Sequence, residues 1–338
     1  MKSSILLIYT GGTIGMICDE VLGVLKPFEF DNLLQQIPQL QKIRANIDTL
    51  SVEKPKDSAE MHPEDWQNLG QLIFDNYEKY SGFVVLHGTD TMAYTTSALS
   101  FMFKNLSKPI IFTGSQLPIG DIRTDAIENV LTSIQIALLK KGGLPLVNEV
   151  CLYFGNQLFR GSGVTKISSQ NFNAFASSNV PILATSNINL SINEAVLISN
   201  TRKKTYFSKR LDEAIFLYKI HPGINQKQFE QICESVFFKV LILETYGSGT
   251  IFVDDWMLEK LAQLIANGVH IINTSQCIFG NVKGIYGATQ LLSGIGVINA
   301  KAMTTEAVVT KSMCLLTKKI RNDEFSSKFI ENWVGELS

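Results

Sequence analysis

The sequence lacks long apolar runs and an excess of charge of either sign. Its longest uninterrupted apolar runs, such as residues 5–9 and 150–154, contain five residues, whereas a membrane-spanning helix needs about 20. The chain carries 30 Lys and Arg residues against 31 Asp and Glu residues, which gives a net charge of −1. A general nucleic-acid-binding protein shows a basic imbalance instead. We therefore expect neither a membrane nor a nucleic acid as a partner.

Cysteine and histidine are few and scattered. The five cysteines are odd in number and contain no CxxC pair, and the four histidines show no HExxH spacing. The signatures of a disulfide framework, a zinc ribbon and a zinc protease are therefore missing, and we expect no metal and no cofactor. The first residues also lack the long apolar core and the cleavage site of a signal peptide. The expected location is the cytoplasm.

The chain has enough apolar material for two globular domains. It contains 338 residues, of which 45% are hydrophobic and 18% charged, and a domain takes roughly 150 residues. Short apolar runs at residues 4–9, 82–86, 109–112 and 149–154 alternate with helical patterns. Runs that are apolar on both faces are typical of parallel strands covered by helices on each side.

This alternation predicts an α/β fold. We expect an N-terminal doubly wound, flavodoxin-like domain with a mainly parallel sheet over residues 1–190, and a smaller C-terminal α/β domain over residues 213–338. Residues 191–212 carry several basic side chains and little periodic signal, and they are the predicted linker. Two of the predicted helices cover residues 93–106 and 323–333.

Hydroxyl side chains gather at the predicted strand ends of the first domain. Three of these ends carry two hydroxyl residues each: Thr10 and Thr13, Thr89 and Thr91, and Thr113 and Ser115. In an open parallel sheet, ligands bind at the carboxyl ends of the strands, and glycines in the same loops let backbone amides approach a ligand. Neither GxxxxGK[ST] nor GxGxxG is present, so the pattern favours hydroxyl nucleophiles over phosphate binding.

Two long motifs in these loops resemble those of a known enzyme family. Residues 9–15 read YTGGTIG and residues 82–92 read GFVVLHGTDTM, which resemble the two signature motifs of the L-asparaginase/glutaminase family. Further segments resemble its cytoplasmic type I branch, and the likeness covers nearly the whole chain. These segments are residues 57–58, 63–66, 160–161, 165–166, 246–249 and 335–337.

The resemblance implies hydrolysis of L-asparagine to L-aspartate and ammonia through a threonine acyl-enzyme, in a homodimer or homotetramer. By motif position, Thr13 is the nucleophile and Thr89 the second catalytic threonine. Lys166 and Asp90 complete a Thr-Lys-Asp arrangement. A threonine hydroxyl needs a base to take its proton, and a lysine enclosed in a low-dielectric pocket can lose its charge and serve as that base.

The resemblance also implies which residues bind the substrate L-asparagine. Asp90, beside Thr89, holds the α-ammonium group through a charge-assisted hydrogen bond. Ser58 holds the α-carboxylate together with backbone groups near Asp57 and Ala59. Backbone amides of the glycine loops are the expected donors to the oxyanion that develops during the reaction.

The sequence departs from the family pattern in two places. The loop after the first motif lacks the tyrosine that assists the nucleophile in many relatives, and Val24 stands in its place. We expect Tyr286, in a glycine-flanked segment, to supply this phenol from either chain of an oligomer. Glu244 stands where some type I enzymes have a basic residue that lines a regulatory asparagine site, in the region of Thr165 and Cys277. We therefore expect no allosteric control by asparagine.

The residues leave other interpretations open. A broader glutaminase-asparaginase differs in accepting one more methylene, which is worth only about 1–3 kcal/mol. An amidase subunit of a transfer-RNA amidotransferase usually carries an additional N-terminal domain, whereas this chain begins at the first strand. A non-catalytic amino-acid sensor on the same fold binds without turnover. Taken singly, Thr13 and Thr89 are also typical of helix caps, and we interpret His87 as a structural residue rather than a general base.

Overall fold

The computed structural model describes residues 3–18, 25–27, 37–200, 203–234, 237–252, 254–284 and 287–337. The chain folds into two compact units. Unit 1 comprises Met1–Ser177 and Pro181–Lys209, and unit 2 comprises Ser178–Val180 and Arg210–Ser338. The two units thus part at Lys209, and the domain boundaries expected at residues 190 and 213 stay a prediction.

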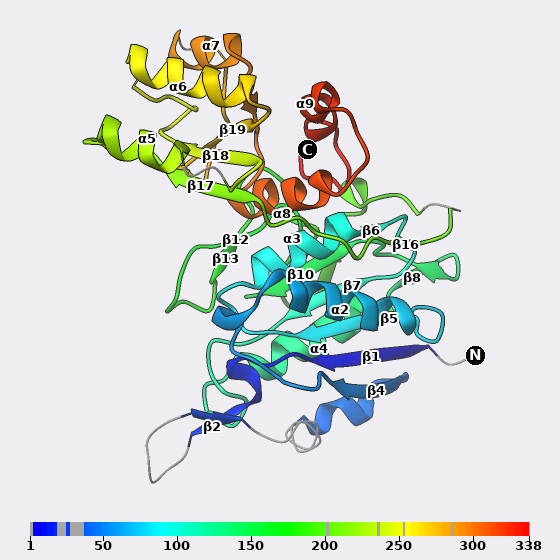
Figure 1. Cartoon of the computed structure of the whole chain (residues 1–338). Coiled ribbons are helices and arrows are strands. Elements are labelled where there is room, and N and C mark those ends of the chain that lie inside the picture. The colour runs from blue at the N-terminus through cyan, green and yellow to red at the C-terminus, as the bar shows by residue number, and fades with distance from the viewer. Residues whose placement is uncertain are drawn as a thin grey trace. The chain divides into compact units, whose positions relative to one another are not determined.

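Unit 1 is built on an eight-stranded sheet with the strand order β15-β14-β11-β10-β7-β5-β1-β4 (Figure 1). Five of its strands are parallel to one another. They are β1 (Ser4–Tyr9), β4 (Asn46–Ser51), β5 (Gly82–Leu86), β7 (Ile110–Thr113) and β10 (Val150–Phe154). Numbered in chain order, these five follow the order 2-1-3-4-5 of flavodoxin-like sheets. The predicted α/β class with a mainly parallel first sheet is confirmed.

An antiparallel extension at one edge makes the sheet mixed. It consists of β11 (Gln157–Arg160), β14 (Ala184–Ser186) and β15 (Leu190–Ile192). Gly155 and Asn156 form the two-residue turn from β10 to β11, and both have positive φ, 56° and 65°. Two such residues are what a tight hairpin between twisted strands requires.

Three helices cover the sheet of unit 1: α2 (Pro63–Asp75), α3 (Met92–Met102) and α4 (Ala126–Leu138). Alternate side chains of the strands belong to opposite faces. Ile5 and Leu7 of β1 share a buried cluster with Val130 of α4. Phe83 of β5 stacks on Tyr77 just after α2, with ring centroids 5.9 Å apart. Both faces are therefore buried, which explains the apolar runs in the sequence.

The helix predicted over residues 93–106 is too long at its C-terminal end. It ends at Met102, because Phe103–Lys104 forms β6 and pairs with β16 (Tyr206–Phe207). Asn105 follows with a φ of 56°, which no helix accommodates. The remaining short elements of unit 1 are β2 (Met16–Cys18), β3 (Leu25–Pro27), β8 (Lys140–Lys141), β9 (Leu144–Pro145), β12 (Thr165–Lys166), β13 (Phe175–Ala176), η1 (Thr13–Gly15), η2 (Pro38–Lys42), η3 (Ser58–Glu60) and η4 (Glu194–Val196).

Unit 2 is a smaller α/β unit with four parallel strands in the order β17-β18-β19-β20 (Figure 1). The strands are β17 (Ile215–Lys219), β18 (Val240–Thr245), β19 (His270–Ser275) and β20 (Ile298–Asn299). Its helices are α5 (Gln226–Glu234), α6 (Asp255–Ala266), α7 (Gly287–Gly294), α8 (Thr305–Leu316), the 3₁₀ turn η5 (Asn322–Glu324) and α9 (Phe325–Phe329). The predicted second α/β domain is confirmed.

The helix predicted over residues 323–333 does not form as one element. The structure has only η5 and the five-residue α9 there. The backbone N–H groups of Trp333 and Val334 donate instead to the carboxylate of Glu336, over 2.8 to 3.1 Å. This side-chain acceptor offers the backbone an alternative to helical hydrogen bonds.

Candidate active site

The switch point of the parallel sheet lies between β1 and β5. The chain leaves β1 to form β4 on one side and then returns to form β5 on the other. Ligands of open α/β sheets bind outside the carboxyl ends of the strands at such a point. Thr13 follows β1 and Thr89 follows β5. The structure therefore places both threonines singled out from the sequence at these two neighbouring strand ends.

Glycine allows the threonine loops to approach each other. Gly12 has a φ of 88°, and a Cβ atom on it would lie 2.3 Å from the Cα of Gly88. A Cβ atom on Gly88 would in turn lie 2.6 Å from Oγ of Ser58. Only residues without a side chain fit these positions. The loop that carries Thr13 therefore packs against the loop that carries Thr89, which in turn packs against Ser58.

Thr89, Asp90 and Lys166 form one hydrogen-bonded group. Nζ of Lys166 donates to Oγ1 of Thr89 over 2.7 Å and to Oδ1 of Asp90 over 2.6 Å. Pairing of β12 with β13 fixes the backbone of Lys166, and 17% of its side chain is exposed, against 61% for Asp90. The structure thus brings these three predicted site residues together, and their catalytic roles stay a prediction.

Ser58 joins the same group from η3. Its Oγ accepts a hydrogen bond from the backbone N–H of Asp90 over 3.1 Å, and its carbonyl accepts one from the Thr91 hydroxyl over 2.6 Å. Ser58 is buried, whereas Asp57 and Ala59 on either side are exposed. The Asp57 carboxylate caps η3 by accepting from the N–H of Ala59 over 3.0 Å. Asp57 and Ala59 therefore have a structural role as well as the predicted contact with substrate.

Thr13 opens the 3₁₀ turn η1 and is partly exposed. Within the part of the chain that the structure describes, its hydroxyl has no hydrogen-bond partner. Tyr9 supports this turn, because its hydroxyl donates to the carbonyl of Gly15 over 3.3 Å. Burial raises the pKa of Tyr9 to about 12, so this phenol stays neutral. The Thr13 hydroxyl is therefore open to a substrate, and to act as a nucleophile it still needs a base that takes its proton.

Comparisons with known proteins agree with this geometry. Residues 4–197 match the family model described as asparaginase, N-terminal, and residues 214–329 match the glutaminase/asparaginase C-terminal domain. The chain belongs to the L-asparaginase family. It is an amidohydrolase of the type I branch of that family.

Relatives of this asparaginase-family chain match it from end to end. L-asparaginase 1 of Escherichia coli (strain K12) is 35% identical over 339 aligned residues, which cover 100% of this chain and 98% of the relative. The structure of L-asparaginase I from Vibrio cholerae is 33% identical with a TM-score of 0.89 and covers 100% of both chains. The thermostable L-asparaginase from Thermococcus kodakarensis is 30% identical with a TM-score of 0.89, over 99% of both chains.

His87 holds the backbone of the second asparaginase motif. Its ring is fully buried, with Nδ1 2.7 Å from the carbonyl oxygen of Gly88 and Nε2 3.0 Å from the Thr95 hydroxyl. Burial lowers the pKa of His87 to about 4, so the imidazole is neutral at physiological pH. With both ring nitrogens engaged, His87 supports the residue next to Thr89, which agrees with the structural interpretation. Nothing in the sequence indicates the contact of His87 with Thr95.

Of the two departures from the family pattern, the structure describes only the one at Glu244. Tyr286 and Val24 both lie outside the described residues. Glu244 is partly buried in unit 2, where its carboxylate accepts from the Thr305 hydroxyl over 2.9 Å and lies 3.4 Å from the ammonium of Lys219. This acid has partners of its own within unit 2, and the expected lack of allosteric control by asparagine stays a prediction.

The described residues also bear on metals, disulfides and membranes. Among them, no three His, Cys, Asp or Glu side chains group closely enough to bind a metal ion. Among the described residues, four cysteines take no part in a disulfide bond: Cys151, Cys233, Cys277 and Cys314. Within the same ranges, every helix is too short or too polar to cross a bilayer.

Proposed function

We propose that this protein hydrolyses L-asparagine to L-aspartate and ammonia through an acyl-enzyme on Thr13. The contact of Lys166 with both Thr89 and Asp90 carries the proposal, because a lysine beside a hydroxyl at the switch point can act as a base. Membership of the family supports the reaction class, and the partly exposed Thr13 at the end of β1 supports the choice of nucleophile.

The proposed reaction has two steps that use the same group. Oγ of Thr13 bonds to the side-chain amide carbon, and its proton passes through the Thr89 hydroxyl to an uncharged Lys166. The carbon–nitrogen bond then breaks, and the nitrogen leaves with that proton as ammonia. In the second step water attacks the ester, its proton returns by the same route, and L-aspartate and the Thr13 hydroxyl are released. Backbone amides of the glycine loops stabilise the oxyanion, an effect of about 3 kcal/mol per donor in other enzymes.

Binding of the substrate's α groups is proposed for the surroundings of Asp90 and Ser58. The Asp90 carboxylate is largely exposed and has one oxygen directed to Lys166, which leaves the other for the α-ammonium. The turn at Asp57, Ser58 and Ala59 receives the α-carboxylate. With one group bound at each place, both charged ends of the amino acid are fixed and its side chain is presented to Thr13.

Ammonia release by the purified protein over a range of L-asparagine concentrations tests the proposal. Thr13→Ala, Thr89→Val and Lys166→Met are each expected to lower kcat by about 10³-fold or more, as the removal of cooperating groups does elsewhere. Thr13→Ser keeps a hydroxyl at the same place and is the matched control for Thr13→Ala. Near-normal turnover by folded Thr13→Ala removes Thr13 as the nucleophile.

The same assay separates the alternative functions. Comparable rates with L-glutamine indicate a broader glutaminase-asparaginase. Calorimetric binding of L-asparagine without ammonia release by folded wild-type protein indicates an amino-acid sensor. The intact Thr89–Lys166–Asp90 group favours an enzyme, because a sensor has no use for a base beside a hydroxyl.

Tyr286 is proposed to supply the phenol that the loop around Val24 lacks. The support is its glycine-flanked segment in the sequence. Tyr286→Phe is expected to lower kcat by about 10-fold or more, in the range typical of a lost proton-transfer group, and full kcat in this variant contradicts the assignment.

We also propose a cytoplasmic homodimer or homotetramer without a nucleic-acid partner. Unit 1 fully exposes Ile122 and Ile188, and unit 2 leaves 68% of Phe279 exposed. Homodimer interfaces are more apolar than other protein surfaces, and cysteines outside disulfides suit a reducing compartment. Light scattering after size-exclusion chromatography measures the mass directly, and a monomer contradicts the proposed assembly.

A further inference from the structure

The proposed substrate-binding segment consists of residues 57–59. Lys56, which precedes this segment, contacts the loop that carries Thr13. The backbone N–H of Lys56 donates to the carbonyl of Thr10 over 3.0 Å. Gly11 has a φ of 118°, and a Cβ atom there would lie 2.0 Å from the Lys56 carbonyl oxygen. The position of Lys56 therefore sets how the substrate-binding segment lies relative to the Thr13 loop.

One carboxylate holds both ends of this segment. Nζ of Lys56 donates to Oδ1 and Oδ2 of Asp65 over 2.7 and 2.9 Å. The backbone N–H of His62 donates to Oδ2 of the same carboxylate over 2.9 Å. Because Lys56 precedes residues 57–61 and His62 follows them, Asp65 closes a ring around the substrate-binding segment.

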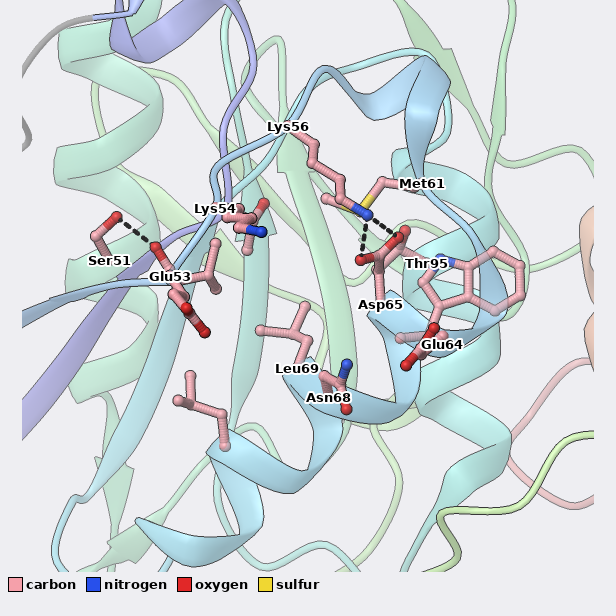
Figure 2. Close-up of a pocket in the computed structure, with 14 residues that line it drawn as sticks. Ser51, Glu53, Lys54, Lys56, Met61, Glu64, Asp65, Asn68, Leu69 and Thr95 are labelled. Carbon is pink, nitrogen blue, oxygen red and sulfur yellow. Dashed lines mark hydrogen bonds and ion pairs between the residues drawn. The ribbon is translucent and has the colours of Figure 1, made fainter.

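A cavity of about 540 Å³ borders this ion pair. In Figure 2 the Lys56 ammonium faces both carboxylate oxygens of Asp65 at the wall of this cavity, and Lys54 lies apart from the pair. The Lys56 and Asp65 side chains are 33% and 22% exposed. Where a cavity takes the place of packed side chains, few van der Waals contacts resist movement. The charge-assisted hydrogen bonds are then the main restraint on the segment from this side.

We propose that Lys56 and Asp65 are positioning residues for substrate binding, because their ion pair holds residues 57–59 in the conformation that receives the α-carboxylate. The inference rests on the proposed function, which assigns that role to the segment. Residues 57–59 contact the α groups of the substrate and not the amide that reacts. A loosened segment therefore weakens binding in the ground state and in the transition state alike, which raises KM and leaves kcat nearly unchanged.

Steady-state ammonia release by Lys56→Met and Lys54→Met tests this role. Lys54 is an exposed lysine on the same cavity, so its replacement removes the same charge and leaves the ion pair intact. Lys56→Met is expected to raise KM for L-asparagine about 10-fold, because binding is lost equally in the ground state and the transition state, with kcat within about 3-fold of wild type. Lys54→Met keeps the wild-type KM. Lys56→Arg restores KM, because a guanidinium makes the same two contacts.

Amide hydrogen exchange tests the same role without turnover. Residues 57–61 are expected to exchange faster in Lys56→Met and Asp65→Asn than in Lys54→Met, because the ring that closes the segment is opened. If wild-type protein releases no ammonia, the proposed function fails and exchange still decides the inference. Unchanged KM in an active Lys56→Met enzyme, or exchange equal to that of Lys54→Met, overturns it.

Discussion

The ammonium nitrogen of Lys166 lies 2.6 Å from a carboxylate oxygen of Asp90. The same nitrogen contacts the Thr89 hydroxyl, so the carboxylate orients Lys166 toward the hydroxyl. The pair also raises a question of chemistry, because a lysine can serve either as a base or as a fixed positive charge. Arginine keeps that charge permanently, which makes it possible to separate a base from a fixed cation at this position.

Lys166→Arg is expected to lower kcat about 10²-fold or more, the range for loss of a general base. The guanidinium can still pair with Asp90, so calorimetric binding of L-aspartate is expected to persist. Ammonia release and L-aspartate binding are measured on the same preparation. A Lys166→Arg enzyme with wild-type kcat shows that Lys166 acts only as a cation.

Gly12→Ala is expected to remove activity and destabilise unit 1. The new Cβ atom would lie 2.3 Å from the Cα of Gly88, and φ at Gly12 is 88°, so backbone strain adds to the clash. We expect a loss of about 2 kcal/mol or more in the free energy of unfolding, typical of such positions. Gly120→Ala is the matched control, because nothing lies within 4 Å of a Cβ atom there. Equal thermal midpoints for the two variants contradict the packing of the two threonine loops.

His87 is expected to make the protein sensitive to acid. Burial lowers its pKa from 6.5 to about 4 in the folded state, so below pH 6.5 the unfolded chain binds a proton that the folded chain does not. Stability from this group is fully present above pH 6.5 and is lost as the pH falls to about 4, by roughly 3 kcal/mol in all.

The test compares urea unfolding at pH 7.5 and pH 4.5 for wild type and His87→Gln. Glutamine can donate to the Gly88 carbonyl without titrating, so the variant is expected to lose less stability on acidification. His221→Gln, at an exposed position, is the control and keeps the wild-type dependence. The same acid loss in His87→Gln and wild type shows that His87 is not the titrating group.

The sequence predicted four of the five parallel strands of unit 1 because their signal is local. A strand covered on both faces reads as a short apolar run, and glycine-rich loops mark its end, so the positions of β1, β5, β7 and β10 followed directly. The edge strand β15 and its neighbour β14 have only three residues each and carry no such run. The early end of α3 at Met102 depends on pairing with Tyr206–Phe207, about 100 residues later in the chain. Contacts between residues so far apart in the chain produce no periodic pattern in the sequence.

The same difference between local signals and long-range contacts applies to the candidate site. Thr13, Thr89 and Asp90 could be singled out from the sequence as candidates because long, specific segments carry them, and their roles stay a prediction. The Lys56–Asp65 ion pair could not, because a lysine before an Asp-Ser turn and an acid in the first turn of a helix each have ordinary explanations. Only the fold shows that one carboxylate reaches back nine residues to close the segment between them.

Lys311→Met is expected to destabilise unit 2 strongly. Lys311 and Glu336 pair over 2.5 Å with both side chains fully buried, and Lys311 also lies 5.0 Å from the ring centroid of Trp333. Burial lowers the pKa of Lys311, and the nearby Glu336 opposes that shift. Removing the cation leaves the buried carboxyl group of Glu336 without its ion-pair partner, which costs about 3–5 kcal/mol in comparable cases.

The double variant Lys311→Met with Glu336→Gln distinguishes a lost ion pair from lost packing. If the unpaired charge causes the damage, neutralising Glu336 recovers part of the stability, and the two changes are less than additive. Urea unfolding followed by tryptophan fluorescence gives the midpoints, with Lys328→Met as the control at an exposed ion pair. A Lys311→Met midpoint equal to that of Lys328→Met shows that the buried pair does not hold the C-terminal segment, whereas additive losses assign the effect to packing around Trp333.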